Sequence, residues 1–136
     1  MKFSELELAF EFVSSAEPGM NQAFLERDTG VIHWHSEYGD NEAELPEDIA
    51  ADRFVEIPHK KDLDLGKPLA LRFAELHLRD RHSQVQAIFS GPGAYARFKD
   101  LLEHDGKLKA WHAFEEQEGH AALRNWCLEN GIDVDG

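Results

Sequence analysis

The chain has 136 residues, with 27 acidic and 14 basic side chains and a formal net charge of −13. Hydrophobic residues make up 42% of it and charged residues 30%, a balance typical of a folded globular protein rather than a disordered one. No apolar run approaches the roughly 20 residues of a membrane-spanning helix, and the N-terminus lacks a signal-peptide core. The single cysteine, Cys127, excludes an internal disulfide and any multi-cysteine metal site. We therefore expect a cytoplasmic protein.

The negative charge is unevenly distributed along the chain. Residues 1–58 hold 14 acidic and 3 basic residues, a net charge of −11, whereas residues 59–136 hold 13 acidic and 11 basic, a net charge of −2. A strongly acidic chain binds nucleic acid poorly, because contacts to phosphate need Lys and Arg. Nucleic acid is therefore an unfavoured partner, and the acidity favours plain solubility over two alternatives, a surface for a basic partner and a mimic of nucleic acid.

Residues 4–15 are predicted to form the first helix. Ser4 and Glu7 have the spacing of a capping box, and Phe3 and Leu8 occupy the two positions of a hydrophobic staple. The buried side of this helix is expected to carry apolar residues at helical spacing: Leu6, Ala9, Phe10 and Val13.

Residues 22–27 and 31–36 are predicted to pair as a β-hairpin. The turn is Asp28-Thr29-Gly30, in which Gly30 supplies a left-handed residue after a type I turn. A third short strand over 53–57, ended by Pro58, is expected to pair with the hairpin. Between these strands lies a segment that we predict to be an acidic surface loop, with Glu37, Asp40, Glu42, Glu44, Glu47, Asp48 and Asp52.

The second half of the chain is predicted to be helical. A helix opened by Pro68 runs to about Arg79, and a short helix precedes Gly91-Pro92-Gly93. An amphipathic helix with Pro92 in its first turn then runs to about His104. Two further helices are expected on either side of Gly119, the last one ended by Asn130-Gly131 as a left-handed cap. The residues expected to face inward in this half are Leu69, Phe73, Leu76, Val85, Ile88, Phe89, Ala94, Phe98, Leu101, Leu102, Leu108, Trp111, Phe114, Ala122, Leu123, Trp126 and Cys127.

These elements predict a segregated α+β fold. It comprises an N-terminal helix, a small antiparallel three-stranded sheet and a C-terminal run of four to five helices. We expect one domain over 1–136, with an acidic helix-plus-sheet part over 1–58 and a helical part over 59–136. Because strands and helices do not alternate, a doubly wound fold with a nucleotide crevice is disfavoured.

Four segments, taken in order, resemble a bacterial group of unknown function, uncharacterised protein family 0158. They are Phe24 through Gly30, Leu45 through Asp48 followed by Arg53 through Pro58, Gly91 through Asp100, and Trp111 with Phe114, Trp126 and Glu129 through Ile132. The family usually has a basic residue between the two glycines and a Phe before the Arg-Phe-Lys segment, where this chain has Pro92 and Tyr95. The resemblance supports the fold boundaries and implies no established activity.

The hairpin offers the one candidate for metal binding. Ile32 and Trp34 are expected to face the core, which leaves His33 and His35 on the more exposed face, with Glu37 two residues further on. Two histidines and a carboxylate can hold zinc or ferrous iron, but exposed strand histidines are the more common outcome of this pattern. We therefore expect no metal site and no cofactor.

The glycine-rich stretch before the amphipathic helix is the candidate binding site. Gly91, Gly93, Tyr95, Arg97 and Lys99 are predicted to form a surface at an outward-facing helix N-terminus. The alternative is a tight helix–helix corner with both basic side chains paired to neighbouring carboxylates. An acidic loop of a partner protein, or a small anion, would suit the surface.

The remaining chemistry favours a binding role. The other histidines, His59, His77, His82, His104, His112 and His120, fit no Ser/His/Asp pattern, and Cys127 is expected to be buried. We predict a protein-binding or regulatory module rather than an enzyme. The alternatives are a small hydrolase using histidine with a carboxylate or a metal, and a nucleic-acid-linked regulator; the sequence leaves the partner and the oligomeric state open.

Overall fold

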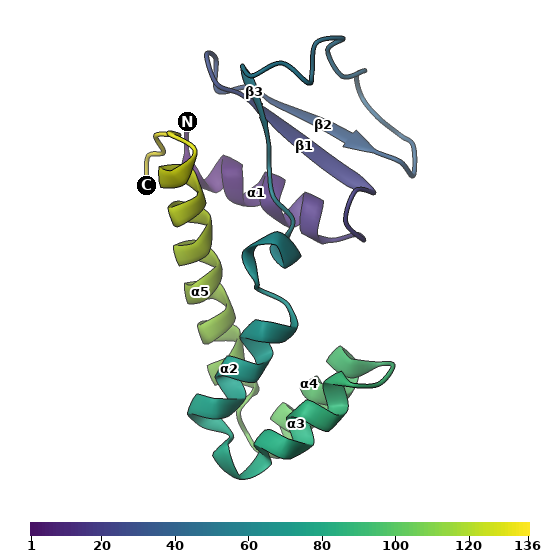
Figure 1. The fold of residues 1–136 in the computed structure, drawn as a ribbon, viewed down its shortest axis with the longest axis vertical. Coiled ribbons are helices and arrows are strands. Elements are labelled where there is room, and N and C mark those ends of the chain that lie inside the picture. The colour runs from purple at the N-terminus through teal and green to yellow at the C-terminus, as the bar shows by residue number, and fades with distance from the viewer. The chain divides into compact units, whose positions relative to one another are not determined.

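The structure, a computed structural model, describes residues 1–136 and confirms the α+β fold (Figure 1). The N-terminal helix is followed by a three-stranded antiparallel sheet and then by four α-helices, with two short 3-10 turns among them. The elements are α1 (Phe3–Ser14), β1 (Asn21–Glu26), β2 (Ile32–Ser36), β3 (Phe54–Glu56), η1 (Lys60–Leu63), α2 (Lys67–His77), η2 (Arg79–Arg81), α3 (His82–Phe89), α4 (Ala94–His104) and α5 (Leu108–Glu129).

The chain forms two compact units. The first comprises residues 1–63 and 123–136, and the second comprises residues 64–122. The first unit is therefore discontinuous in sequence, and α5 contributes its beginning to the second unit and its end to the first. The expectation of one domain over 1–136 stays a prediction.

In the first unit, α1 covers one face of the sheet (Figure 1). The strand order is β2-β1-β3, so β1 is the central strand and β2 lies at an edge. Ala23 and Leu25 of β1 are buried, because alternate residues of a strand point to the same face and this face meets α1. The core of this unit contains Phe3, Leu6, Ala9, Val13, Ala23, Ile57, Leu123 and Cys127.

The hairpin forms as predicted with Gly30 left-handed, but its turn begins one residue earlier, because β1 ends at Glu26 and Arg27 belongs to the turn. Gly30 has φ of 76°, and its N–H donates to the Glu26 carbonyl at 2.9 Å. The Glu26 N–H in turn donates to the Val31 carbonyl at 2.8 Å, which closes the hairpin. Glycine suits this position, because an L side chain at positive φ is strained.

The start of α1 differs from the prediction. The N-cap residue is Lys2 in extended conformation, and no side chain caps the helix, so the capping box at Ser4 and Glu7 is wrong. The Phe3 N–H instead donates to the Asp135 carbonyl at 2.9 Å, and the Asp135 N–H donates to the Met1 carbonyl at 2.9 Å. Backbone pairing with the C-terminal segment thus replaces a side-chain cap. The hydrophobic staple is also wrong, because Leu8 is 61% exposed.

In the second unit, α2, α3, α4 and the beginning of α5 enclose a core of their own. Its buried residues are Leu69, Ala70, Phe73, Ala74, Leu78, Val85, Ile88, Phe98, Leu101, Leu102 and Trp111. Leu76 was expected inside but is exposed, since the buried stripe of α2 runs through Ala70 and Ala74. Two small residues there allow close packing where the sequence pattern favoured a large one.

Two predicted helix boundaries in this half are wrong. Helix α4 begins at Ala94, with Gly93 as a left-handed N-cap at φ of 65°, so Pro92 lies in the preceding turn rather than inside the helix. Gly119 does not separate two helices but lies within α5, where a glycine costs only about 1 kcal/mol. The apolar stripe lapses near Gly119 because the two ends of α5 pack into different cores.

The predicted end of α5 is confirmed. Gly131 is left-handed, the Ile132 N–H donates to the Cys127 carbonyl at 2.9 Å, and the Gly131 N–H donates to the Leu128 carbonyl at 3.3 Å. This is the bond pattern of a Schellman motif. None of the helices combines the length and apolar content that crossing a bilayer requires.

The corrected helix start gives a stability prediction. We expect Ser4→Ala to change the free energy of unfolding by less than about 0.5 kcal/mol, because Ser4 caps nothing. Gly30→Ala should lower it by about 1–2 kcal/mol, because alanine is strained at φ of 76°. Urea denaturation of both variants measures the free energies of unfolding. If Ser4→Ala lowers the free energy as much as Gly30→Ala does, Ser4 does cap the helix.

Candidate functional site

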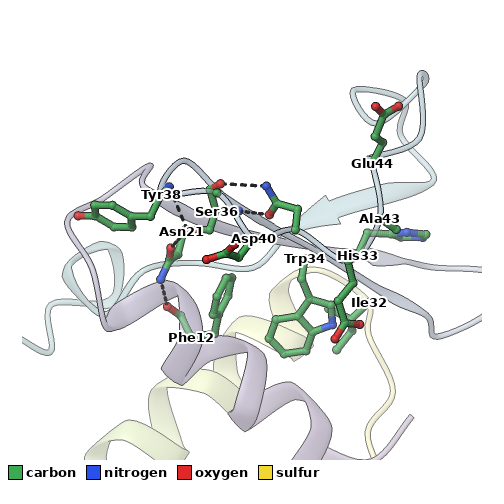
Figure 2. Close-up of a pocket in the computed structure, with 13 residues that line it drawn as sticks. Phe12, Asn21, Ile32, His33, Trp34, Ser36, Tyr38, Asp40, Ala43 and Glu44 are labelled. Carbon is green, nitrogen blue, oxygen red and sulfur yellow. Dashed lines mark hydrogen bonds between the residues drawn. The ribbon is translucent and has the colours of Figure 1, made fainter.

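A groove of about 770 Å³ lies beside β2 in the first unit (Figure 2). Trp34 and Ile32 of β2 and Phe12 of α1 form its apolar part, with the Phe12 and Trp34 rings edge to face at 5.2 Å. Trp34 is 42% exposed, and Tyr38, at the other end of the groove, is 70% exposed. The groove thus has an exposed aromatic side chain at each end, and Trp and Tyr are enriched at protein interfaces.

The far end of the groove is held by a network of hydrogen bonds around Asn21, which is almost fully buried. The Asn21 amide nitrogen donates to the Phe12 carbonyl at 3.0 Å, and its oxygen accepts from the Ser36 hydroxyl at 2.7 Å. The same Ser36 oxygen accepts from the Tyr38 N–H at 3.2 Å. These bonds join the end of α1 to the end of β2 and fix the backbone of Tyr38 (Figure 2).

The loop that follows β2 makes the groove acidic. Residues 37–52 carry seven acidic side chains and neither Lys nor Arg. Three of the seven, Asp40, Glu42 and Glu44, line the groove, and Glu42 and Glu44 also border a second hollow of about 350 Å³ beside His35. The groove therefore combines an apolar floor with a negative rim.

The outer edge of β2 has backbone groups that the sheet does not use. In an antiparallel ladder, residues alternate between hydrogen-bonded and non-bonded pairs. Two backbone bonds show which pairs of the β1–β2 ladder are hydrogen-bonded: the Glu26 N–H donates to the Val31 carbonyl, and the Glu37 N–H donates to the Met20 carbonyl. Because bonded pairs recur at every second residue, His33 and His35 also form bonded pairs with β1. The N–H and C=O groups of the intervening residues Ile32, Trp34 and Ser36 consequently point away from the sheet.

Only Ser36 finds partners at that edge. The Ser36 N–H donates to the side-chain oxygen of Asn41 at 2.7 Å, and the Asn41 amide nitrogen donates to the Ser36 carbonyl at 3.1 Å (Figure 2). No hydrogen bond within the protein occupies the outward N–H and C=O groups of Ile32 and Trp34. The edge is thus hydrogen-bonded at Ser36, whereas its backbone groups at Ile32 and Trp34 have no hydrogen-bond partner within the protein.

The exposure of the β2 side chains differs from the prediction. Trp34 does face α1 as expected, but it is more exposed than His33 and His35, whose side chains are 25% and 28% exposed. Helix α1 covers the central strand more fully than the edge strand, which leaves Trp34 at the rim of the core. His33 is partly covered from the other side, since its ring packs edge-on against Phe54 at 5.6 Å.

The opposite face of the sheet carries an ion-pair network. Glu26 accepts from His33 Nε2 at 3.2 Å and from Arg53 Nη1 at 3.0 Å. Arg53 also pairs with both carboxylate oxygens of Asp48 and lies over the Phe54 ring, 4.4 Å from its centroid. All members satisfy one another, so this network fastens β3 and the acidic loop to the hairpin and leaves no group aimed at a ligand.

The metal candidates do not converge. His33 pairs with Glu26, whereas His35 Nε2 lies 3.1 Å from Glu37 Oε1, so each imidazole has its own carboxylate. No group of three or more His, Cys, Asp or Glu side chains is placed to hold a metal ion. The pattern of two histidines and Glu37 in sequence thus becomes two separate pairs in space.

The predicted site on the second unit is a turn between α3 and α4. Arg97 Nη2 donates to the Ile88 carbonyl at 2.9 Å and so binds the end of α3. A Cβ on Gly91 would lie 2.9 Å from the same Nη2, so a larger residue there would require the end of the Arg97 side chain to shift. Arg97 pairs with a backbone carbonyl rather than with the carboxylates that the alternative hypothesis named. The binding surface proposed from the sequence stays a prediction; its residues are Gly91, Gly93, Tyr95, Arg97 and Lys99.

Tyr95 packs edge-on against Phe89 at 5.3 Å and is about half exposed. Burial raises the pKa of its phenol, and the nearby Glu115 carboxylate raises the pKa further. Tyr95 therefore stays protonated at neutral pH and keeps its O–H as a donor. It contributes packing between α3 and α4.

Cys127 and His59 are buried. Burial raises the pKa of the Cys127 thiol, while the positive charge of Arg124 acts in the opposite direction. Cys127 thus stays a thiol within the first core, as predicted. His59 lies 2.8 Å from the Ala16 carbonyl through Nε2 and accepts the Lys61 N–H at Nδ1, which assigns it a structural role.

Sequence reasoning missed the groove. The relevant signals were present, because Trp34 and Tyr38 flank the beginning of the densest acidic segment in the chain. What the sequence did not show is that α1 stops short of the β2 edge. Protein-family profiles, curated proteins and solved structures yielded no match to the chain. The resemblance to uncharacterised protein family 0158 therefore stays a prediction.

The two basic residues of the predicted site should behave differently on substitution. Arg97→Ala removes the bond to the Ile88 carbonyl and should lower the free energy of unfolding by about 1–2 kcal/mol. Lys99→Ala, its matched control on the same helix, should change that free energy by less than about 0.5 kcal/mol. Urea denaturation measures both, and equal losses would show that the Arg97 bond contributes nothing.

Zinc titration tests the histidine pairs. Because His33 and His35 pair with different carboxylates, we expect untagged protein to bind well under one equivalent of zinc. Calorimetric titration measures this binding. Stoichiometric binding that disappears in the His33→Ala, His35→Ala double variant would contradict the separate pairing.

Proposed function

We propose that this is a cytoplasmic protein-binding module whose binding site is the groove beside β2. The observation that carries the proposal is the combination at one place of exposed Trp34 and Tyr38, a negative rim and unused backbone groups. Aromatic residues are enriched at protein interfaces, and a polar rim around an apolar centre is their usual arrangement.

The enzyme alternative has less support. Its candidate groups would be the pairs of His33 with Glu26 and of His35 with Glu37. General acid–base catalysis in a hydrolase also needs a nucleophile or an activated water held in a concave pocket. Glu26 is already shared with Arg53, and neither pair has a serine or cysteine hydrogen-bonded to its imidazole.

Nucleic-acid binding is also less favoured. Most arginines already have partners, with Arg53, Arg72 and Arg81 paired to carboxylates. Arg27 and Arg97 donate to backbone carbonyls. Most arginines are thus engaged within the protein, and the net charge of −13 opposes the approach of a phosphate backbone.

Site-specific photo-crosslinking in the native host tests the proposal. We expect p-benzoylphenylalanine in place of Trp34 to give a discrete protein adduct on irradiation. The matched control replaces Leu128, which is 79% exposed on α5 and does not line the groove, and should give no such adduct. A third variant at Lys99 tests the predicted site on the second unit.

The adduct is read by mass spectrometry after denaturing purification, and the melting temperature of each variant confirms its fold. No adduct at position 34, or the same adduct at positions 34 and 128, would contradict a binding site at the groove. An adduct at position 99 alone would move the site to the turn before α4.

A further inference from the structure

We propose that the outer edge of β2 binds an extended, basic segment of a partner protein by strand addition, with the segment's backbone paired to Ile32 and Trp34. The inference rests on the proposed function and adds to it the binding mode and the chemistry of the partner segment.

The backbone of β2 supplies the pairing groups. Both the N–H and the C=O of Ile32 and of Trp34 point outward, because the bonded pairs with β1 fall on His33 and His35. An added strand satisfies such groups as β1 satisfies the inner ones, and this is a common mode of peptide recognition. Loops and edges without a partner otherwise depend on water.

The Asn41 side chain shows that this edge accepts a peptide-like group. Its carboxamide binds the Ser36 N–H and C=O at 2.7 and 3.1 Å, as the peptide groups of a neighbouring strand would. It also fixes the extent of the binding site, because Ser36 is already occupied. The segment would therefore pair at Ile32 and Trp34 and end before Ser36.

The acidic loop selects a basic occupant. Asp40, Glu42 and Glu44 line the groove, and the last two border the hollow on the other side of the edge as well. Apolar side chains of the segment would lie on the Trp34 face, near Phe12, and Lys or Arg would alternate with them. A second copy of this chain is disfavoured, because it would bring the same carboxylates to the same edge.

Amide hydrogen exchange with a model peptide tests the backbone pairing. The probe is a capped seven-residue peptide of alternating Val and Lys, added at saturating concentration to the full-length, nitrogen-15-labelled protein. The exchange of the Ile32 and Trp34 amides should slow at least about tenfold. The His33 and His35 amides, which already bond to β1, should change little and serve as the internal control.

Two N-methylated peptides separate strand addition from simple charge attraction. One is methylated on the Val amides and the other on the Lys amides, so that each loses the donors on one side of the strand. Binding should weaken at least about tenfold for one of them only, as measured by fluorescence anisotropy. Equal binding by both methylated peptides would overturn strand addition, and equal binding by a Val/Glu peptide would overturn the preference for a basic segment.

The site itself is tested with a triple variant, Asp40→Asn, Glu42→Gln and Glu44→Gln, whose fold is checked by its melting temperature. It should weaken binding of the Val/Lys peptide at least about tenfold, whereas the matched variant Glu116→Gln, Asp133→Asn and Asp135→Asn, which also removes three negative charges outside the groove, should not. If both variants bind the peptide equally weakly, the attraction depends only on the net charge of the protein, and the proposed site is overturned. Light scattering detects self-association of the protein. If self-association accounts for the slowed exchange of the Ile32 and Trp34 amides, the occupant is a second copy of this chain and the proposal is overturned.

Failure of this inference is distinguishable from failure of the proposed function. An adduct at position 34 together with no binding of the Val/Lys peptide would reject the basic strand and retain the groove as a protein-binding site. No adduct and no peptide binding would reject both.

Discussion

The phase of the β1–β2 ladder is the constraint on which the groove depends. One set of alternating residues bonds to β1, so the other set must direct its backbone outward. The pleat at the same time directs Ile32 and Trp34 toward α1 and the two histidines away from it. A shift of one residue in register would exchange both the faces and the free backbone groups. The bonds from the Gly30 N–H to the Glu26 carbonyl and from the Glu26 N–H to the Val31 carbonyl fix that register at the turn.

The groove exists because helix α1 covers the central strand β1 more fully than the edge strand β2. Helix α1 buries Ala23 and Leu25 on the central strand, whereas Trp34 on the edge strand keeps 42% of its surface. Proteins usually protect such an edge with charged residues or a covering loop. Here, the loop after β2 supplies the charge but bonds to the backbone of the edge only at Ser36, through Gly39 and Asn41. The same acidic loop therefore both discourages like-charged neighbours and favours basic ones.

Much of the fold could be predicted from local patterns. The hairpin turn and the Schellman end of α5 follow from single glycines at positive φ, and periodicity located most of the helices. The start of α1 could not be predicted, because its first N–H pairs with Asp135 at the other end of the chain. The helix over Gly119 was missed because its two halves serve different cores, so that no single apolar stripe spans it. The groove required knowledge of where α1 ends relative to β2, which is a tertiary relation without a local sequence signal.

The discontinuous first unit has a consequence for synthesis. Its core needs Leu123 and Cys127, which leave the ribosome after the whole of the second unit. The core of residues 64–122 can therefore close while α1 and the sheet still lack their last packing partners. The bond between Phe3 and Asp135 closes almost the entire chain into one loop, so the loop entropy is lost only at the end of folding. On a translating ribosome, the part of the protein made first is thus completed last.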